Sequence, residues 1–458
     1  MVSWIFLGAI ELIIFIIGIN IHPFLMVLIP ISLLILWWLI NHPAVTLMFM
    51  SLTAIVKGYL VSYISIFQVL DVTVIITIII WLGLIKIVLN DEWKLSKDLK
   101  APVYLFLLFG ILLCLSFIYT PSPGYGLRKI LRFNTFGLTM FITPLIVVKT
   151  SEDSKRLLTY FKYLIIIIIG IVLFQFVYFL NKGSYAIVLA YWNRISIPGA
   201  NPIQVSRYLA IGAAMVITLL IRNKPTESMH YFVILFTILL SIILSGSRGP
   251  LLSVIIGIIF YAFMYERKNI KRIYSYGILA IGLVIIILVI LPENLTQRFI
   301  NLTEGSIILT QQGVKQISTI ATRLEFWSMS LKAWFSSIPN FFFGLGVGGF
   351  SSLFIWRDWR WYPHNLFFEI IAEIGLIGLL IMLAFLRKFF KAINLGFSGG
   401  SFTEHSALWV AGTFVIFFAA QFSGDFNDNR ILWMLIGITM ASTYADKADE
   451  IKNQLNSI

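Results

Sequence analysis

Apolar runs of roughly 20 residues recur along the whole chain. They restrict the possible folds more than any other feature, because a helix of that length crosses the roughly 30 Å of hydrocarbon in a bilayer. Hydrophobic residues make up 59% of the 458 residues, and charged residues make up 12%. Soluble domains carry roughly 25% charged residues. The sequence therefore predicts an all-α integral membrane protein.

We predict about 14 transmembrane helices, within a range of about 12–14. The first apolar run is expected to be a retained span, because no basic segment precedes it and no small-residue cleavage site follows it. The predicted spans are residues 4–19, 23–40, 44–66, 72–89, 101–118, 130–148, 157–180, 207–221, 231–245, 250–265, 273–290, 365–386, 405–423 and 431–445.

The positions of Lys and Arg predict the orientation, because cytoplasmic loops are enriched in these residues. One set of alternate short loops carries Lys94, Lys97, Lys100, Lys149, Lys155, Arg156, Arg222, Lys224, Arg267, Lys268, Lys271, Arg272, Arg387, Lys388 and Lys391. The opposite set carries Arg128, Lys129, Lys182, Arg194, Arg248 and Arg430. We expect the first set and both termini to be cytoplasmic. Basic loops also account for the net charge of +13 without a nucleic-acid partner.

This orientation divides the chain into four parts. Residues 1–290 are expected to form transmembrane helices 1–11, and residues 291–363 an extracytoplasmic loop domain. Residues 364–446 are expected to form helices 12–14, followed by a cytoplasmic tail at 447–458. The single cysteine, Cys114, excludes an intramolecular disulfide.

The long outer loop is expected to be ordered, because it is rich in Trp and Phe, and one of its segments has the period of an amphipathic helix. The apolar face of this helix comprises Leu324, Trp327, Leu331, Trp334, Phe335 and Ile338. Thr322 and Glu325 have the spacing of a capping box at its start. We expect the helix to lie on the outer leaflet or to roof a cavity.

Three places on the outer side combine a predicted helix start with a cationic or protonatable side chain. They are Arg248 in the sequence Ser-Gly-Ser-Arg-Gly-Pro, Arg323 at the start of the loop helix, and His364 before the expected N-cap Asn365. Helix N-termini carry partial positive charge and free N–H groups. A pyrophosphate is a ligand that suits all three places together, so we expect them to converge on one anion site.

Each of these residues also has a structural interpretation. Arg248 can extend to lipid headgroups, Arg323 can pair with Glu325, and His364 can be an interfacial hydrogen-bonding residue. Glu369 and Glu373 lie one turn apart near the top of a span, where the alternatives are pairing with a buried Arg and a functional role.

Two further outer segments are expected to be structural. The glycine-rich run from Gly344 to Gly349 is predicted to pack tightly rather than to bind an anion, because it lacks the Lys of a phosphate-binding loop. Asp425 and Asp428 are expected to hydrogen-bond an arginine. A metal site is not predicted there, because two aspartates supply too few ligands.

These segments resemble the O-antigen ligase and O-antigen polymerase family. The resemblance includes Ser-Gly-Ser-Arg-Gly-Pro before a span, Arg323 followed by Trp327, and the Gly-x-Gly run before Pro363-His364-Asn365 with Glu369, Glu373 and Gly375. Pro198-Gly199-Ala200-Asn201-Pro202 is similar to the family's upstream Asn-Pro turn. The resemblance covers residues from about 195 to 430 and rests on the order and spacing of several short motifs.

The resemblance implies a metal-independent, inverting glycosyltransferase without a cofactor. The donor is a saccharide on undecaprenyl pyrophosphate, and the acceptor is a glycan or a lipid. Arg248 and Arg323 would neutralise the departing pyrophosphate, and His364 would act as general base or orient the acceptor. Arg132, Arg194 and Arg207 are weaker candidates, placed by topology, for which contact with the lipid pyrophosphate and extension to lipid headgroups are equal alternatives. Asn365, Glu369 and Glu373 are further candidates for binding substrate.

The family contains two activities, and we favour a polymerase slightly over a ligase that attaches the glycan to the lipid A core. The expected location is the bacterial inner membrane, with the active site facing the periplasm or exterior. A lipid-linked oligosaccharide flippase is the rival from another class, but a flippase would place cations through the membrane depth rather than at its outer edge. A structural scaffold would leave the outward Arg and His residues unexplained.

Overall fold

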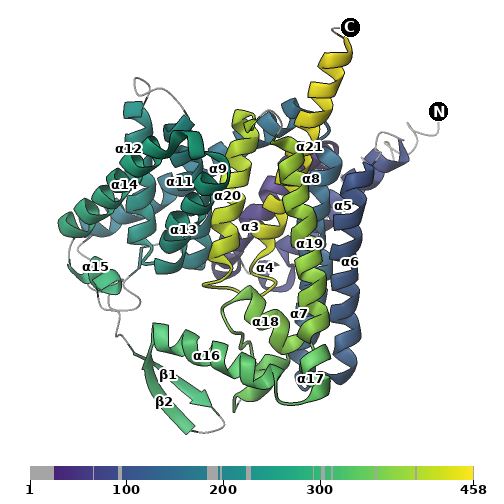
Figure 1. Ribbon diagram of the computed structural model, residues 1–458, viewed down its shortest axis with the longest axis vertical. Helices are drawn as coiled ribbons and strands as arrows, with labels where there is room; N and C mark the ends of the chain where they lie inside the picture. The colour runs from purple at the N-terminus through teal and green to yellow at the C-terminus, as the bar shows by residue number, and fades with distance from the viewer. Residues whose placement is uncertain are drawn as a thin grey trace.

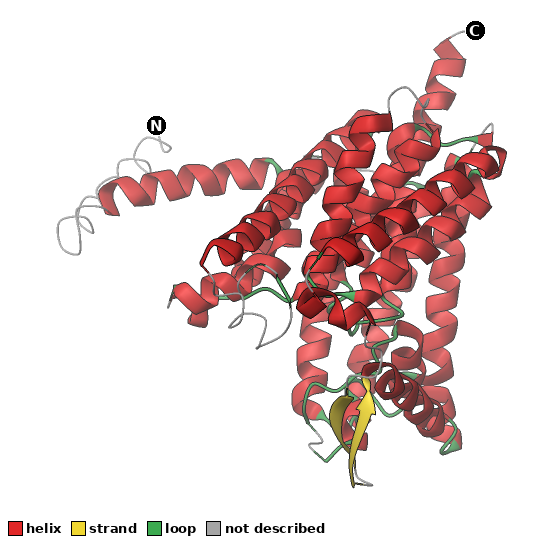
Figure 2. Cartoon of the chain, turned by 90° about the vertical axis from the view of Figure 1, so that its left-hand side faces the viewer, coloured by secondary structure: helices red, strands yellow, loops and turns green. Residues whose placement is uncertain are grey.

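The computed structural model describes residues 25–64, 66–90, 95–182, 194, 195, 197, 199–222, 228–291, 293–300, 305–310, 313–355, 358–397 and 400–456. Helices form nearly all of this part of the chain (Figure 2). The helical elements of the first half are α2 (Leu25–Asn41), α3 (Pro43–Tyr63), α4 (Ile66–Val69), α5 (Val72–Leu89), α6 (Lys97–Ser116), η1 (Phe117–Tyr119), α7 (Pro123–Arg132), the π-helical η2 (Phe133–Gly137), α8 (Leu138–Val147) and α9 (Ser151–Lys182).

The second half contains the remaining helices and two strands. They are α11 (Pro202–Arg222), α12 (Ser228–Leu244), α13 (Arg248–Tyr265), η4 (Arg267–Asn269), α14 (Ile270–Ile290), α15 (Glu293–Ile300), β1 (Gly305–Thr310), β2 (Gly313–Ser318), α16 (Thr319–Trp334), α17 (Ile338–Phe343), η5 (Gly349–Leu353), α18 (Leu366–Glu373), α19 (Gly375–Gly396), α20 (Glu404–Ala419) and α21 (Arg430–Asn456).

Seven helices in the described part of the chain are long and apolar enough to cross a membrane. They are Val72–Leu89, Lys97–Tyr119, Pro123–Val147, Ser151–Tyr178, Pro202–Arg222, Arg248–Tyr265 and Arg267–Ile290. The count becomes eight if Val27–Asn41 and Pro43–Thr53, bent by 106°, form one span. A helical membrane protein is therefore confirmed, although the described helices that meet this criterion are fewer than the predicted total of about 14. The predicted span 4–19 lies outside the described residues.

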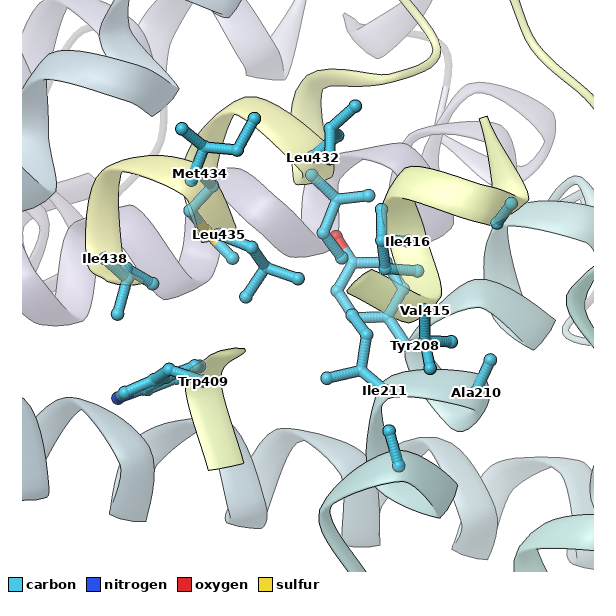
Figure 3. Close-up of a cluster of buried hydrophobic side chains, with 14 of the residues drawn as sticks. Tyr208, Ala210, Ile211, Trp409, Val415, Ile416, Leu432, Met434, Leu435 and Ile438 are labelled. Atoms are coloured by element: carbon cyan, nitrogen blue, oxygen red, sulfur yellow. The ribbon is translucent and has the colours of Figure 1, made fainter. Parts of the chain in front are cut away.

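The centre of the bundle is formed by α11, α20 and α21, which are the most completely buried helices. Of the most apolar 18 residues of α11, 94% are buried, against 6% for α14 at the periphery. Figure 3 shows this core, where Tyr208 and Ile211 of α11 face Val415 and Ile416 of α20 and Leu435 of α21. Such packing leaves the outer surface of α14 for lipid.

Within the predicted loop domain, the two strands, α16 and α17 lie at the end of the bundle opposite the C-terminal end of α21 (Figure 1). The domain has its own small core, which contains Phe326, Phe350 and Phe354, packed against Ala372 of α18. It also contains an antiparallel hairpin, in which Gly305 of β1 pairs with Ser318 of β2 and Thr310 with Gly313. The all-α prediction is therefore wrong for this segment. Glycines bound its runs of β-favouring residues, such as Ile307 and Val314.

Two predicted helices begin or end elsewhere. The loop helix α16 begins at Thr319, so Thr322 is already helical and the predicted capping box with Glu325 does not start it. The predicted span 365–386 is divided into α18 and α19. The division falls at Gly375, whose φ of 69° lies in the left-handed region and interrupts the helix.

Candidate functional site

His364 lies at the junction between the loop domain and α18, in a backbone conformation that is uncommon for its residue type. Its φ is 59°, and among the described residues other than glycine no other φ is positive. The imidazole stacks on Phe326 of α16, with ring centroids 6.2 Å apart, and its centroid is 4.4 Å from that of Tyr362. These two rings hold the imidazole in an aromatic pocket. Its Nδ1 is buried and has no hydrogen-bond partner among the described residues.

The surroundings of His364 favour the neutral imidazole. Burial, followed by the positive charge of Arg323, lowers the pKa of His364 to about 4. Arg360 and Arg207 act in the same direction, and Asp425 partly opposes them. At neutral pH the ring is therefore unprotonated and able to accept a proton.

Arg323 lies on α16 one turn before Trp327, and α16 packs against α18. The indole Nε1 of Trp327 donates to the carbonyl of Pro363 over 3.1 Å, and its ring stacks on Phe368 of α18. These contacts hold α16 beside His364. Burial, and then the like charge of Arg248, lower the pKa of Arg323. Arg323 is thus close enough to affect both residues, since its charge lowers the pKa of His364 and the charge of Arg248 lowers its own.

The start of α13, which carries Arg248, lies beside the loop between α20 and α21. Arg248 is the first residue of α13, with Ser247 at the N-cap position. A side chain added at Gly249 would contact Phe422 in that loop at 3.4 Å. The preceding residue, Gln421, accepts through its carbonyl from Asn365 Nδ2 over 3.2 Å, next to His364. Arg323 differs from the prediction in one respect, since it lies in the second turn of α16 rather than at its start.

Asn365 is confirmed as the N-cap of α18. Its Oδ1 accepts from the backbone N–H groups of Phe367 and Phe368, at 2.9 and 3.1 Å. Both the carbonyl and amide ends of this side chain are therefore engaged within the protein, and its observed contacts position the start of α18.

The three weaker arginine candidates lie in different environments. Arg207 is fully buried in α11, where it donates to the carbonyls of Ser423 and Asp428 over 2.5 and 3.1 Å. Arg194 is half-buried beside Ile195, whose N–H donates to Leu244 at the end of α12, four residues before Arg248. Arg132 is exposed at the end of α7. Arg207 therefore shapes the loop that carries Gln421 and Asp425.

Glu369 and Glu373 are held by a lysine that the sequence had placed in an outer loop. Lys129 lies in α7 with no exposed surface, and its ammonium donates to Glu369 and, over 2.6 Å, to Glu373. Glu373 also accepts from the N–H of Gly348 over 2.8 Å. The structure therefore supports the pairing interpretation of the two glutamates, with a lysine in place of the expected arginine.

Asp425 and Asp428 bind an arginine, as predicted, and the partner comes from the distant loop domain. Arg360 contacts Asp425 at 3.4 Å and Asp428 at 2.7 Å, and Tyr125 donates to Asp425 over 2.9 Å. Against the effect of burial, the charges of Arg360 and Lys129 hold the pKa of Asp425 below its usual value. Among the described residues, no group of three or more His, Cys, Asp or Glu side chains is arranged to hold a metal ion.

The glycine run is confirmed as a tight packing element. Gly344, Gly346 and Gly348 have φ values of 71°, 85° and 74°. A Cβ at Gly346 would lie 2.8 Å from the carbonyl oxygen of Ser116, at the end of α6. The N–H of Gly346 donates to the carbonyl of Glu373 over 2.9 Å. The run thus joins α6 and α18 through its backbone.

Sequence reasoning did not single out Lys129, Tyr125, Arg360 or Tyr362. The stretch 123–132 contains glycines and three basic residues, so it resembles a loop, although it forms a helix with one buried face. The sequence does contain one indication that Lys129 is buried. In a helix, Lys129 lies on the same face as Tyr125, Gly126 and Ile130. The partner of Arg360 lies 65 residues away and leaves no local signal.

Comparison with curated proteins finds no match. Residues 232–383 match the model of a protein family described as O-antigen ligase. The matched segment begins in α12 and ends in α19, and it includes Arg248, Arg323, His364, Asn365, Glu369 and Glu373. The match indicates a bacterial membrane protein with a function of the ligase or polymerase type. The matched segment, which contains Arg248, Arg323 and His364, is thus the region by which this chain is recognised as similar to the O-antigen ligase family, as the resemblance predicted.

Proposed function

We propose that the protein is a glycosyltransferase that transfers a saccharide from undecaprenyl pyrophosphate to an acceptor hydroxyl at the outer face of the bacterial cytoplasmic membrane. We further propose that the acceptor is a second lipid-linked saccharide, so that the enzyme is a polymerase. The observation that carries the proposal is the geometry around His364: Trp327, one turn after Arg323, donates to the carbonyl of Pro363, and the buried Nδ1 of His364 has no hydrogen-bond partner among the described residues. Two cations beside one base suit a reaction in which a pyrophosphate leaves and a hydroxyl attacks.

In this reaction the acceptor oxygen attacks the anomeric carbon from the side opposite the pyrophosphate. A new glycosidic C–O bond forms with inversion, while the anomeric C–O bond to the pyrophosphate breaks. The electron pair of that bond remains on the pyrophosphate, where Arg248 and Arg323 neutralise the added charge. The hydroxyl proton passes to the imidazole of His364.

The low pKa of His364 keeps the base available but makes it weak in the empty site. A bound pyrophosphate would offset the charges of Arg323 and Arg360 and raise that pKa. The histidine would therefore become a stronger base when the donor is bound. Arg194, whose neighbour Ile195 donates its N–H to the carbonyl of Leu244 at the end of α12, remains a candidate for binding the donor. Arg207 and Asn365 are better assigned to positioning, because Nη1 and Nη2 of Arg207 and both ends of the Asn365 amide are engaged by the protein.

The predicted topology is part of the proposal. Both termini would be cytoplasmic, and the loop domain 291–363 would face the periplasm or exterior. The C-terminal end of α21 lies at the opposite end of the bundle from α16 and α17, which supports this orientation (Figure 1).

The test is transfer from a synthetic undecaprenyl-pyrophosphate oligosaccharide by purified protein in detergent, with EDTA present. A ladder of longer lipid-linked products, lost after His364→Ala and after Arg248→Ala, is the expected result. His230→Ala and Arg267→Ala are matched controls, because both residues are exposed and Arg267 lies beyond the other end of α13. Product formed only after a lipid A core acceptor is added would identify a ligase. No transfer to any acceptor, with donor movement across liposomes, would identify a flippase.

A further inference from the structure

The loop helix α16 has two apolar sides, and the fold uses one of them. Phe326 and Ala333 are buried, and they face the loop core and α18. At 3.6 residues per turn, Leu324, Leu331 and Phe335 lie on the opposite side. Their exposed fractions are 56%, 38% and 64%. The face predicted from the sequence to be the apolar face is therefore directed away from the protein core.

The exposed apolar side continues into α17. Phe341 connects the two helices, since its ring stacks on Trp334 at 5.1 Å and lies 5.8 Å from that of Phe335. Ile338, Phe342 and Phe343 are 76%, 42% and 50% exposed. We call Leu324, Leu331, Phe335, Ile338, Phe342 and Phe343 the outer apolar surface. A continuous apolar patch of this kind is uncommon on a surface that faces water.

We propose that the outer apolar surface is embedded in the outer leaflet of the bilayer, so that α16 and α17 anchor the loop domain in the membrane interface. The occupant is lipid because the surface continues into a lipid-facing helix. Tyr119, at the end of α6, donates to the carbonyl of Phe343 over 2.8 Å. Its neighbour Ile118 is 83% exposed, and Leu115, one turn earlier, is 55% exposed.

The flanks of α16 also suit a membrane interface. Trp327 and Trp334 are half-buried between the two sides, and their indole N–H groups are bonded to backbone carbonyls. Tryptophan is enriched at the headgroup level of membrane proteins. Lys332 is exposed on the polar side of the helix, from which its long side chain reaches water. The helix lies across the bundle axis, near the ends of α6 and α19 (Figure 1).

Embedding α16 would place Arg323 at the depth of lipid phosphates. Helices of this kind lie roughly 5–10 Å into the boundary between headgroups and acyl chains. The site described above would then meet its lipid-linked substrate without lifting it from the leaflet. That consequence rests on the proposed function, whereas the embedding itself does not.

Spin labels test the embedding without an activity assay. The chain has one cysteine, Cys114, which is exposed on α6 and serves as the lipid-facing reference in the unaltered protein. In a Cys114→Ser background, Leu324→Cys and Phe335→Cys provide two labels on the outer apolar surface. Lys332→Cys provides a matched label on the polar side of the same helix. The full-length protein is reconstituted in phosphatidylethanolamine and phosphatidylglycerol nanodiscs, and collision rates with oxygen and with a water-soluble nickel chelate are measured.

We expect the ratio of oxygen to nickel collisions at positions 324 and 335 to be several-fold higher than at position 332, and close to that at Cys114. Equal ratios at all three α16 positions would overturn the proposal and show a surface that faces water. Low collision rates with both reagents, together with spin–spin broadening, would overturn it in favour of a second copy of the chain. Absence of glycosyl transfer by the unaltered protein, with a high ratio retained, would contradict the proposed function alone.

Discussion

Trp327 donates its indole hydrogen bond to the carbonyl of Pro363, the residue before His364, over 3.1 Å. This bond connects the helix that carries Arg323 to the backbone that carries the histidine. The spacing of four residues between Arg323 and Trp327 now has a structural reason. One helical turn allows the arginine to face the site while the tryptophan holds the helix in place.

Trp327→Phe should lower kcat more than it raises KM. The phenyl ring can still stack on Phe368, but the bond to Pro363 is lost and His364 is less well positioned. We expect kcat to fall by about tenfold or more, because small displacements of a reacting group are costly. Trp359→Phe is the control, since Trp359 is exposed. Equal kcat values in the two variants would show that Trp327 does not position His364.

The pH profile should reflect the pKa of His364. The neutral imidazole is the active form, so kcat/KM should fall as the pH drops through about 4, rather than through its ordinary value of 6.5. Arg323→Gln removes a positive charge, so the pKa should rise and the acid limb should move to higher pH. Arg267→Gln should leave the limb in place. An acid limb near 6.5 in the unaltered protein would show that burial and Arg323 do not lower the pKa of His364.

Lys129→Met should destabilise the protein strongly. It leaves Glu369 and Glu373 buried without their shared cation, and breaking a buried ion pair costs about 3–5 kcal/mol. We expect a clear fall in Tm in detergent, measured by scanning fluorimetry. Lys155→Met is the matched control on an exposed lysine. Adding Glu369→Gln and Glu373→Gln to Lys129→Met should recover part of the loss, and no recovery would argue against charge as its cause.

Gly346→Ala should destabilise the junction between α6 and α18. A side chain in the left-handed region costs about 1–2 kcal/mol. The new Cβ would also lie 2.8 Å from both the carbonyl oxygen of Ser116 and the Cα of Thr120. Gly282→Ala in α14 is the control, because its Cβ would meet no atom within 4 Å. Thermal unfolding of both variants in the same detergent measures the difference, and equal Tm values would exclude the packing role.

The parts of the fold that sequence predicts well are those set by local patterns. The membrane class follows from apolar length, the cap at Asn365 follows from side-chain chemistry, and the packing role of Gly344–Gly349 follows from conformational freedom. Each of these three features is determined by the residues of one short segment and by whether water or lipid surrounds it. None requires knowledge of a distant partner.

The predictions fail where a contact with a segment distant in the sequence determines the position of a side chain. The residues around Lys129 in the sequence give no sign that its side chain is buried. Burial is possible because the ammonium pairs with Glu369 of α18, which is 240 residues away in the chain. The apolar stripe of α16 was identified, but periodicity cannot tell which of two apolar sides meets the protein. The ion pair of Arg360 could not be predicted, because its partner Asp428 lies in the loop between α20 and α21, which only the fold brings beside it. The helix start predicted for Arg323 was wrong by one turn, because α16 begins at Thr319, and the convergence of Arg248, Arg323 and His364 stays a prediction.

The pairing of Lys129 with Glu369 also concerns biosynthesis, because the two residues are 240 positions apart. At about 5–20 residues per second, the ribosome makes the lysine roughly 12–48 s before its first carboxylate. During that interval the ammonium has no carboxylate partner, and a charged side chain within the hydrocarbon is costly. We therefore expect the helix that begins at Pro123 to remain beside the insertion machinery or at the interface until α18 emerges. Folding of this membrane protein would then proceed from its second half back to its first.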